Sequence, residues 1–174
     1  MATLSAPLFI SLRLVVLAAS AVAFLAPAFA TDLGWKTWRD SEYDFTVDVP
    51  TALFPVERDG PLGGTELRSE DGSLSLLING QMNGDELPMG TLLDIFIENS
   101  GEKTVTYKRT KNNWLVVSGL QSEDDGTQTI YYIRAETTPD RSRLSSFTIY
   151  YPKSRKAEFD AIVTRMSRSL TPPQ

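Results

Sequence analysis

The sequence predicts an α+β protein built on an antiparallel β-sheet of about six to seven strands, with a helix packed on each face. Residues 104–134 contain three β-rich runs separated by two polar turn segments, which is typical of an antiparallel meander. Those strands carry apolar residues on both faces, and two other segments show the period of amphipathic helices. Both faces of the sheet therefore need a covering layer.

The first thirty residues have the pattern of a secretory signal peptide. Arg13 precedes an apolar run over 14–25, and Ala28 and Ala30 are the small residues that a signal peptidase reads. An uncleaved anchor is the alternative, but the run has about a dozen residues where a membrane span needs roughly 20. We expect cleavage after Ala30, no stable membrane span afterwards, and a bacterial protein that is periplasmic or secreted.

Cleavage would leave 144 of the 174 residues, which suits one domain. We place this domain at 31–170 and predict a disordered, proline-rich tail at 171–174. The mature chain has 16 basic and 22 acidic residues, which argues against a nucleic-acid partner. The chain has no cysteine, so its core must stabilise it without disulfides.

Residues 45–49 alternate apolar and polar and predict a strand that ends at Pro50. Trp35 and Trp38 precede this strand. We interpret them as apolar anchors of the N-terminal segment, with a ligand-stacking pair as the alternative.

The glycine-rich stretch 59–64, DGPLGG, resembles a phosphate-binding loop only superficially, because no helix follows it. We interpret it as a flexible loop between two strands. Residues 65–69 and 73–79 then predict a hairpin around the turn 70–72, and 80–89 predicts a turn-rich linker.

Residues 91–100 predict a short buried helix, with Thr91 as its N-cap and Gly101 at its C-terminal end. Three further strands are expected at 114–119, 129–135 and 143–151, and Trp114 is expected to be buried. From Ser154 onward the period is helical again. Its apolar stripe is formed by Phe159, Ile162, Val163, Met166 and Leu170.

These elements resemble the PsbP-like α/β/α sandwich. The resemblance rests on Tyr43-Asp44-Phe45 leading to Val49-Pro50, the helix before Val105-Thr106-Tyr107, the hairpin of 114–119 with 128–134, and Tyr151-Pro152 before the final helix. It extends over 35–170 and is greatest to exported bacterial members of unknown function. Other members are a photosystem II extrinsic subunit and a yeast import factor that binds the Ran GTPase. The resemblance implies protein binding and supplies no catalytic motif.

The chain contains neither histidine nor cysteine. Histidine-based triads, cysteine nucleophiles and thiolate zinc sites are therefore excluded. Carboxylate chemistry remains open, since a glycosidase needs two facing Asp or Glu residues. The densest acidic cluster is Glu123, Asp124 and Asp125. It precedes Gly126 and lacks the spacing of a calcium loop, so we interpret it as a solvated turn.

A serine nucleophile with a lysine base is the other chemistry left open. A lysine base must be desolvated, yet the available lysines lie in polar surroundings: Lys103, Lys108, Lys111, Lys153 and Lys156. Ser118 lacks a Gly-x-Ser-x-Gly elbow and is interpreted as a small residue that lets a helix approach. We predict no catalytic residue, no cofactor-binding residue, no metal ligand and no cofactor.

Arg134 shares its strand face with Ile130 and Tyr132. We expect its stem to be buried and its guanidinium to reach solvent at the strand end. An ion pair with a carboxylate, or an anionic ligand, is the alternative.

The sequence thus favours an exported, non-enzymatic domain that binds another envelope protein or assists an envelope complex. A carboxylate-dependent hydrolase of envelope polysaccharide is the alternative. We expect function at the edges of the sheet, near Trp35 and Trp38, in the loop 59–64, or at the acidic turn 123–125. The sequence leaves the partner and the oligomeric state open.

Overall fold

The computed structural model describes residues 32–99, 104–123 and 126–174. These residues belong to one compact unit. None of the helices within them is long and apolar enough to cross a membrane. The predicted signal peptide, its cleavage site, Gly101, Lys103, Asp124 and Asp125 lie outside the described residues.

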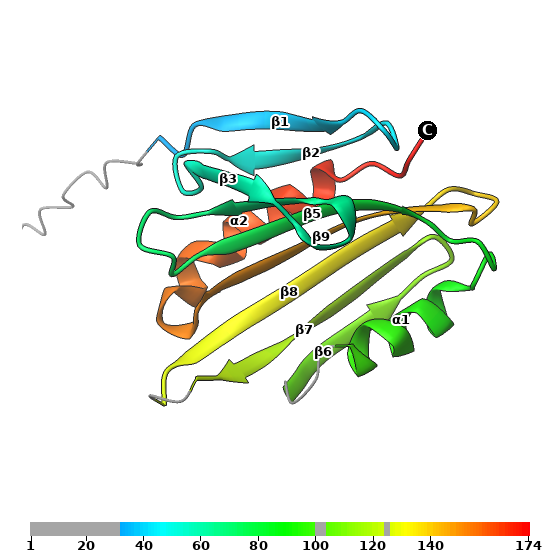
Figure 1. Cartoon of the computed structure of the whole chain (residues 1–174). Helices are drawn as coiled ribbons and strands as arrows, with labels where there is room; N and C mark the ends of the chain where they lie inside the picture. The colour runs from blue at the N-terminus through cyan, green and yellow to red at the C-terminus, as the bar shows by residue number, and fades with distance from the viewer. Residues whose placement is uncertain (1–31, 100–103, 124–125) are drawn as a thin grey trace, which may run out of the picture. The chain divides into compact units, whose positions relative to one another are not determined.

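The described part of the chain contains nine strands and two α-helices (Figure 1). In chain order they are β1 (Trp35–Asp40), β2 (Phe45–Pro50), β3 (Val56–Asp59), β4 (Thr65–Arg68), β5 (Ser75–Met82), α1 (Met89–Glu98), β6 (Thr104–Thr110), β7 (Trp114–Ser122), β8 (Gln128–Thr137), β9 (Arg143–Pro152) and α2 (Lys156–Ser169). Short 3₁₀ turns occupy Pro61–Gly63 and Lys153–Arg155.

Seven strands form one antiparallel sheet in the order β3-β4-β5-β9-β8-β7-β6. The predicted α+β class, the strand number and the two helices are confirmed. The membership of the sheet differs, because β3 is one of the seven strands and β2 is not. Strand β5 also continues to Met82, through part of the segment predicted as a linker.

Strands β1 and β2 form a separate antiparallel hairpin (Figure 1). The hairpin packs on α2 and on the main core through Phe45, Val47 and Val49, which are all buried. Since these side chains cover the core, the backbone of β2 does not extend the main sheet. The prediction that residues 45–49 belong to the main sheet is therefore wrong.

Trp35 and Trp38 lie on β1 and pack, partly buried, against the core. The ring of Trp38 lies 5.9 Å from that of Phe45, and the guanidinium of Arg165 lies 4.1 Å from the ring centroid of Trp35. Arg165 also pairs with Asp48 at 3.0 Å. The two tryptophans are thus anchors, as predicted, although the sequence analysis did not identify their strand.

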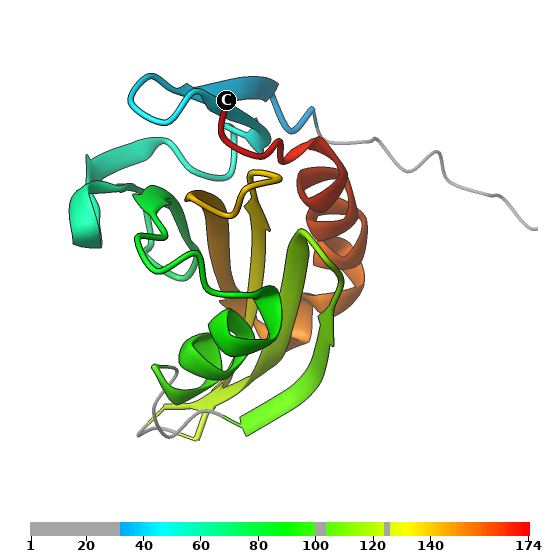
Figure 2. The same ribbon diagram turned by 90° about the vertical axis from the view of Figure 1, so that its right-hand side faces the viewer.

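Successive residues of β8 alternate between two apolar clusters. Ile130 packs in the cluster that contains the buried side chains of α2, whereas Tyr131 and Ile133 pack in the cluster that contains those of α1. Side chains that alternate along a strand point to opposite faces of the sheet. Figure 2 shows the two helices in relation to the strands.

Helix α1 begins two residues before its predicted N-cap. Pro88 occupies the N-cap position with φ −66° and ψ 153°, and Met89, the first helical residue, is buried. Thr91 lies inside the helix and is exposed, so its predicted role as N-cap is wrong. Burial of Met89 therefore decides where the helix begins.

The tail 171–174, predicted to be disordered, is hydrogen-bonded to the rest of the domain. The backbone N–H of Thr171 donates to the Thr46 carbonyl at 2.9 Å, and its hydroxyl accepts from the Thr46 N–H at 2.8 Å. Gln174 donates its N–H to the Tyr43 carbonyl and accepts from Arg143. The C-terminus accordingly lies beside the β1–β2 hairpin (Figure 2).

We expect Gly119→Ala to destabilise the fold by roughly 1 to 3 kcal/mol, as overpacking does. A Cβ atom at Gly119 would lie 2.7 Å from the Tyr131 hydroxyl and 2.8 Å from the Thr104 carbonyl carbon. Gly90→Ala is the control, because it meets no atom within 4 Å and adds a better helix former to α1. Urea denaturation measures both. Equal stability of Gly119→Ala and the wild type would contradict this packing.

Candidate functional site

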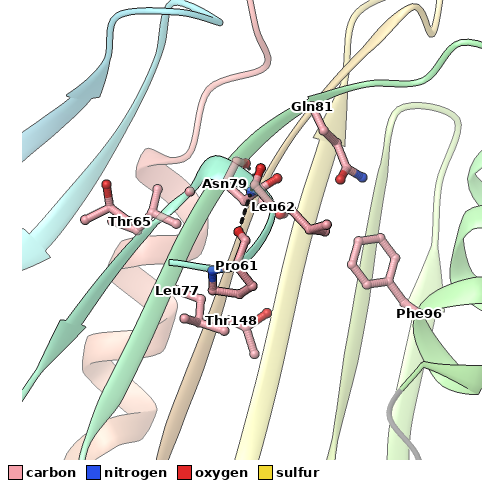
Figure 3. A pocket seen from close by; sticks show the side chains of 11 residues that line it. Pro61, Leu62, Thr65, Leu77, Asn79, Gln81, Phe96 and Thr148 are labelled. Atoms are coloured by element: carbon pink, nitrogen blue, oxygen red, sulfur yellow. Dashed lines mark hydrogen bonds between the residues drawn. The ribbon is translucent and has the colours of Figure 1, made fainter. Parts of the chain in front are cut away.

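The loop 59–64 covers a small cavity on the sheet, which we call the loop cavity (Figure 3). Its volume is about 140 Å³. The 3₁₀ turn supplies Pro61 and Leu62, strand β5 supplies Leu77 and Asn79, and α1 supplies Phe96. The loop that the sequence indicated as a possible site of function therefore borders an actual cavity.

Leu62 lies at the tip of this loop and is 84% exposed. Its φ of 57° is in the left-handed region, which costs a leucine roughly 1 to 2 kcal/mol. Its side chain points from the loop towards Phe96 (Figure 3). A large apolar side chain is thus held in water on a strained backbone, as is often seen at functional sites.

The backbone around Leu62 is fixed by contacts with β5. The side-chain amide of Asn79 donates to the carbonyls of Pro61 and Leu62 at 3.4 Å, and Gly60 donates to the Gly64 carbonyl at 2.7 Å. A Cβ atom at Gly64 would lie 2.7 Å from the Asn79 amide nitrogen. The loop that was predicted to be flexible is therefore closed by hydrogen bonds and lies tightly against β5.

Among the described residues, no charged side chain lines the loop cavity. Its polar groups include the hydroxyl of Thr148 and the amides of Asn79 and Gln81, beside Leu77 and Phe96. A cavity of about 140 Å³ with this lining suits one apolar side chain of a partner and offers nothing for acid–base catalysis.

A larger open groove lies where α2 leaves part of the sheet uncovered, and we call it the tyrosine groove. Its volume is about 520 Å³. The floor is formed by Tyr107 of β6, Ser118 of β7, Ile130 and Tyr132 of β8, and Tyr151 of β9. Its size is that of a ligand-binding pocket.

One wall of the tyrosine groove is a stripe of α2 that includes Asp160, Thr164, Ser167 and Arg168. The Ser167 hydroxyl is 2.9 Å from that of Tyr132. Lys156 also lines the groove and binds both carboxylate oxygens of Asp160, at 2.8 and 2.9 Å. The wall therefore combines hydroxyl groups, a neutralised carboxylate and an exposed arginine.

Burial keeps Tyr132 and Tyr151 of the groove floor neutral over the physiological pH range. Burial raises the pKa of Tyr151 to about 12, and the charge of Asp160 adds to this shift. Burial also raises the pKa of Tyr132, against an opposing hydrogen bond with Ser167. Their hydroxyl groups can donate or accept hydrogen bonds but carry no charge.

Arg134 lies on the same sheet face and is bound to a carboxylate, so the prediction that its guanidinium reaches solvent is wrong. Its Nη2 is 2.5 Å from Oε1 of Glu136, and each of the two side chains is 12% exposed. The guanidinium also lies 4.2 Å from the ring centroid of Trp114, and Arg134 Nε is buried without a hydrogen-bond partner among the described residues. Trp114 itself is only partly buried, because it covers this ion pair and packs in neither apolar cluster.

Burial raises the pKa of Glu136, although the hydrogen bond and the charge of Arg134 act in the opposite direction. The desolvation of the carboxylate therefore outweighs its attraction to the guanidinium. Because the Glu136 carboxylate is paired with Arg134, we interpret the pair as a buried structural element of the sheet face.

The other candidate residues are dispersed over the surface. The backbone of Glu123 closes its turn through Thr127 and Gly126 at 2.9 and 3.0 Å. The described lysines among the candidate bases are all exposed: Lys108, Lys111, Lys153 and Lys156. Ser118 donates its hydroxyl to the Tyr131 carbonyl at 2.8 Å and lines the tyrosine groove.

Two carboxylates line a shallow surface beside α2, and both are already paired with cations of the chain. Asp48 binds Arg165 at 3.0 Å, and Asp160 binds Lys156 at 2.8 Å. Within the described ranges, no group of three or more acidic residues is arranged to hold a metal ion. No observation therefore favours the hydrolase alternative.

The sequence indicated the loop 59–64 as a place of function, but neither Leu62 within it nor the tyrosine groove was predicted. An apolar residue between a proline and two glycines is a usable signal for an exposed apolar tip. The groove joins Tyr107, Tyr132 and Ser167, which lie on three separate elements, so the sequence shows no local pattern for it.

No protein-family model and no curated protein matched the chain. Among solved structures, it resembles the Ran-binding protein Mog1p of Saccharomyces cerevisiae, with a TM-score of 0.55 and 10% identity over 79% of this chain and 94% of that chain. The solution structure of the cyanobacterial PsbP protein, CyanoP, from Synechocystis gives a TM-score of 0.49 and 7% identity, over 79% and 91%. The fold is therefore similar to that of Mog1p, a yeast Ran-binding protein, as the sequence resemblance implied.

We expect Arg134→Ala to lower the free energy of unfolding at pH 7 by roughly 2 to 4 kcal/mol, because it leaves the Glu136 carboxylate desolvated and unpaired. Arg39→Ala is the control. Its pair with Asp44 is exposed, so the loss should stay below about 1 kcal/mol.

The decrease in the free energy of unfolding caused by Arg134→Ala should become smaller as the pH falls. A carboxyl whose folded pKa is raised above its ordinary 4.5 costs stability when ionised, and this cost disappears once the pH is below the unfolded pKa. Denaturation of the wild type and Arg134→Ala from pH 7 to pH 4 tests this. A constant difference over that interval would show that Glu136 is not the group responsible.

Proposed function

We propose that the chain is an exported, non-enzymatic domain with the α/β/α arrangement of PsbP-like proteins, and that it binds another protein of the bacterial envelope. The observation that carries this proposal is the exposed, strained Leu62 beside an uncharged apolar cavity. Leu62 would insert into an apolar surface of the partner, and the loop cavity would accept an apolar side chain in return. Reciprocal apolar insertion of this kind is typical of the central residues of protein interfaces.

The chemistry of the described residues agrees with binding. The chain has no histidine or cysteine, and the loop cavity has no ionisable lining residue. Mog1p, which has the same fold, is a Ran-binding protein. Fold similarity at 10% identity does not show that two proteins bind the same partner. The proposed kind of partner therefore rests on the loop cavity alone.

Export is part of the proposal and rests on the sequence of residues 1–30. The protein recovered from the periplasm should begin at Thr31, because Ala28 and Ala30 suit a signal peptidase. Intact-mass spectrometry checks the new N-terminus. Ala30→Leu should block cleavage, whereas Ala26→Leu should not. Recovery of the full-length chain in the cytoplasm would contradict export.

We expect Leu62→Gly to abolish retention of the partner without loss of stability. Glycine adopts the backbone conformation at this position without strain and removes the apolar side chain, so the fold should be as stable as the wild type or slightly more stable. The measurement is affinity capture from periplasmic extract, with the captured proteins identified and quantified by mass spectrometry, together with thermal denaturation.

Met82→Gly is the matched control, since Met82 is 62% exposed and does not line the loop cavity. A specific partner should be retained by the wild type and by Met82→Gly, and lost with Leu62→Gly. Equal retention by all three chains would disprove the role of the loop cavity.

A further inference from the structure

We propose that the tyrosine groove is a second binding site, which takes an extended acidic peptide segment of a partner protein. The site is separate from the loop cavity, since no residue lines both. The proposal therefore goes beyond the function assigned to Leu62, and the two can fail independently.

The shape of the groove suits an extended chain. Its wall runs along α2 from Lys156 to Arg168, which at about 1.5 Å per residue is roughly 18 Å. An extended peptide rises about 3.3 Å per residue, so five or six residues span this length. The floor strands contact the helix near both ends of this stretch, where Tyr151 stacks on Phe159 and the Tyr132 hydroxyl lies 2.9 Å from that of Ser167.

The floor offers the groups that recognise a peptide. Tyr107 is 51% exposed and presents a large part of an aromatic ring to water. Ser118 and Thr164 donate their hydroxyl protons to carbonyls of this chain, so these hydroxyls, with that of Tyr132, can accept hydrogen bonds from the backbone N–H groups of a peptide. Tyrosine and arginine are enriched in protein-binding surfaces, because they combine a broad apolar area with hydrogen-bonding capacity.

The charge of this face determines the class of peptide. The whole chain has a formal charge of −5. In contrast, the charged residues that line the groove are the ion pair Lys156–Asp160 and Arg168. Beside it lie the ion pairs Arg134–Glu136 and Arg165–Asp48, and Arg109 on the same sheet face. Arg109 and Arg168 have no carboxylate within ion-pair distance in the described part of the chain.

Arg109 lies on the same strand face as Tyr107, two residues further along β6, and its guanidinium is 5.8 Å from the Trp114 ring centroid. Arg168 lies at the C-terminal end of α2. The local excess of two positive charges on an acidic protein is complementary to a segment with acidic side chains. Apolar side chains that alternate with those acids would face Tyr107, Ile130 and Tyr132.

The test uses the mature chain and a set of fluorescein-labelled octapeptides in which Asp or Glu alternates with Phe, Tyr or Leu. Fluorescence anisotropy should detect binding that weakens as NaCl is raised, because the contacts are partly ionic. The same peptides with Asn and Gln in place of the acids should bind at least tenfold more weakly.

Charge reversal locates the site. Arg109→Glu combined with Arg168→Glu should weaken binding of the acidic peptides at least tenfold, and Tyr107→Ala should weaken it independently of charge. Arg58→Glu, an exposed arginine on β3, is the matched control and should bind as the wild type does. Leu62→Gly should also keep full peptide binding, which separates this site from the loop cavity.

Three results would overturn the proposal. The acidic peptides could bind no better than their amide counterparts, or the double variant could bind as well as the wild type. The groove could also bind oligogalacturonate, an acidic oligosaccharide, in preference to every peptide, which would assign it to a polysaccharide.

Discussion

The structure depends on one constraint: the central strands of the sheet are apolar on both faces. Successive residues of β8 pack in different clusters, with Ile130 in the cluster of α2 and Tyr131 in that of α1. Tyr131 and, in the other cluster, Phe147 of the adjacent strand β9 are fully buried. These buried side chains need a cover on both faces of the strands, which α1 supplies for one cluster and α2 for the other. The β1–β2 hairpin does this beside α2, and the C-terminal tail fastens the hairpin through Thr171.

The cover is incomplete, and this explains where the cavity and the groove lie. Six spacings of about 4.8 Å make a seven-stranded sheet roughly 29 Å wide, whereas a helix covers about 10 Å. The surface that the helices leave open must be closed by loops or stay accessible. Around α1, the loop 59–64 folds back over β5 and leaves the loop cavity. Beside α2, the strands β6 and β7 stay open and form the floor of the tyrosine groove.

The sequence allowed the strand-rich centre and the final helix to be predicted, because both depend on periodicity over many residues. The meander, the stripe from Phe159 to Leu170 and the anchoring role of Trp35 and Trp38 were recovered in this way. The membership of β2 could not be predicted, since alternation shows that Phe45 and Val47 are buried but not which element covers them. The position of the tail could not be predicted, because it depends on hydrogen bonds with Thr46, which is distant in sequence. The ion pair of Arg134 could not be predicted either, because it depends on the desolvation of Glu136 under Trp114. The loop cavity was indicated by glycine and proline, whereas the groove arises only when three separate elements meet.

The two open surfaces differ in chemistry, and this bears on how one fold serves different partners. The loop cavity is apolar and uncharged, so it can discriminate by shape. The tyrosine groove combines hydroxyl groups with Arg168 and with the nearby Arg109, and neither arginine has a carboxylate partner among the described residues, so the proposed site would discriminate by charge and hydrogen bonding. Neither surface contributes to the apolar centre through its exposed residues: Leu62, Tyr107 and Arg168 can change without affecting the buried clusters. Exposed residues of the sheet and of its covering elements can therefore vary while the buried clusters stay the same, which is consistent with a fold similar to that of Mog1p at 10% identity.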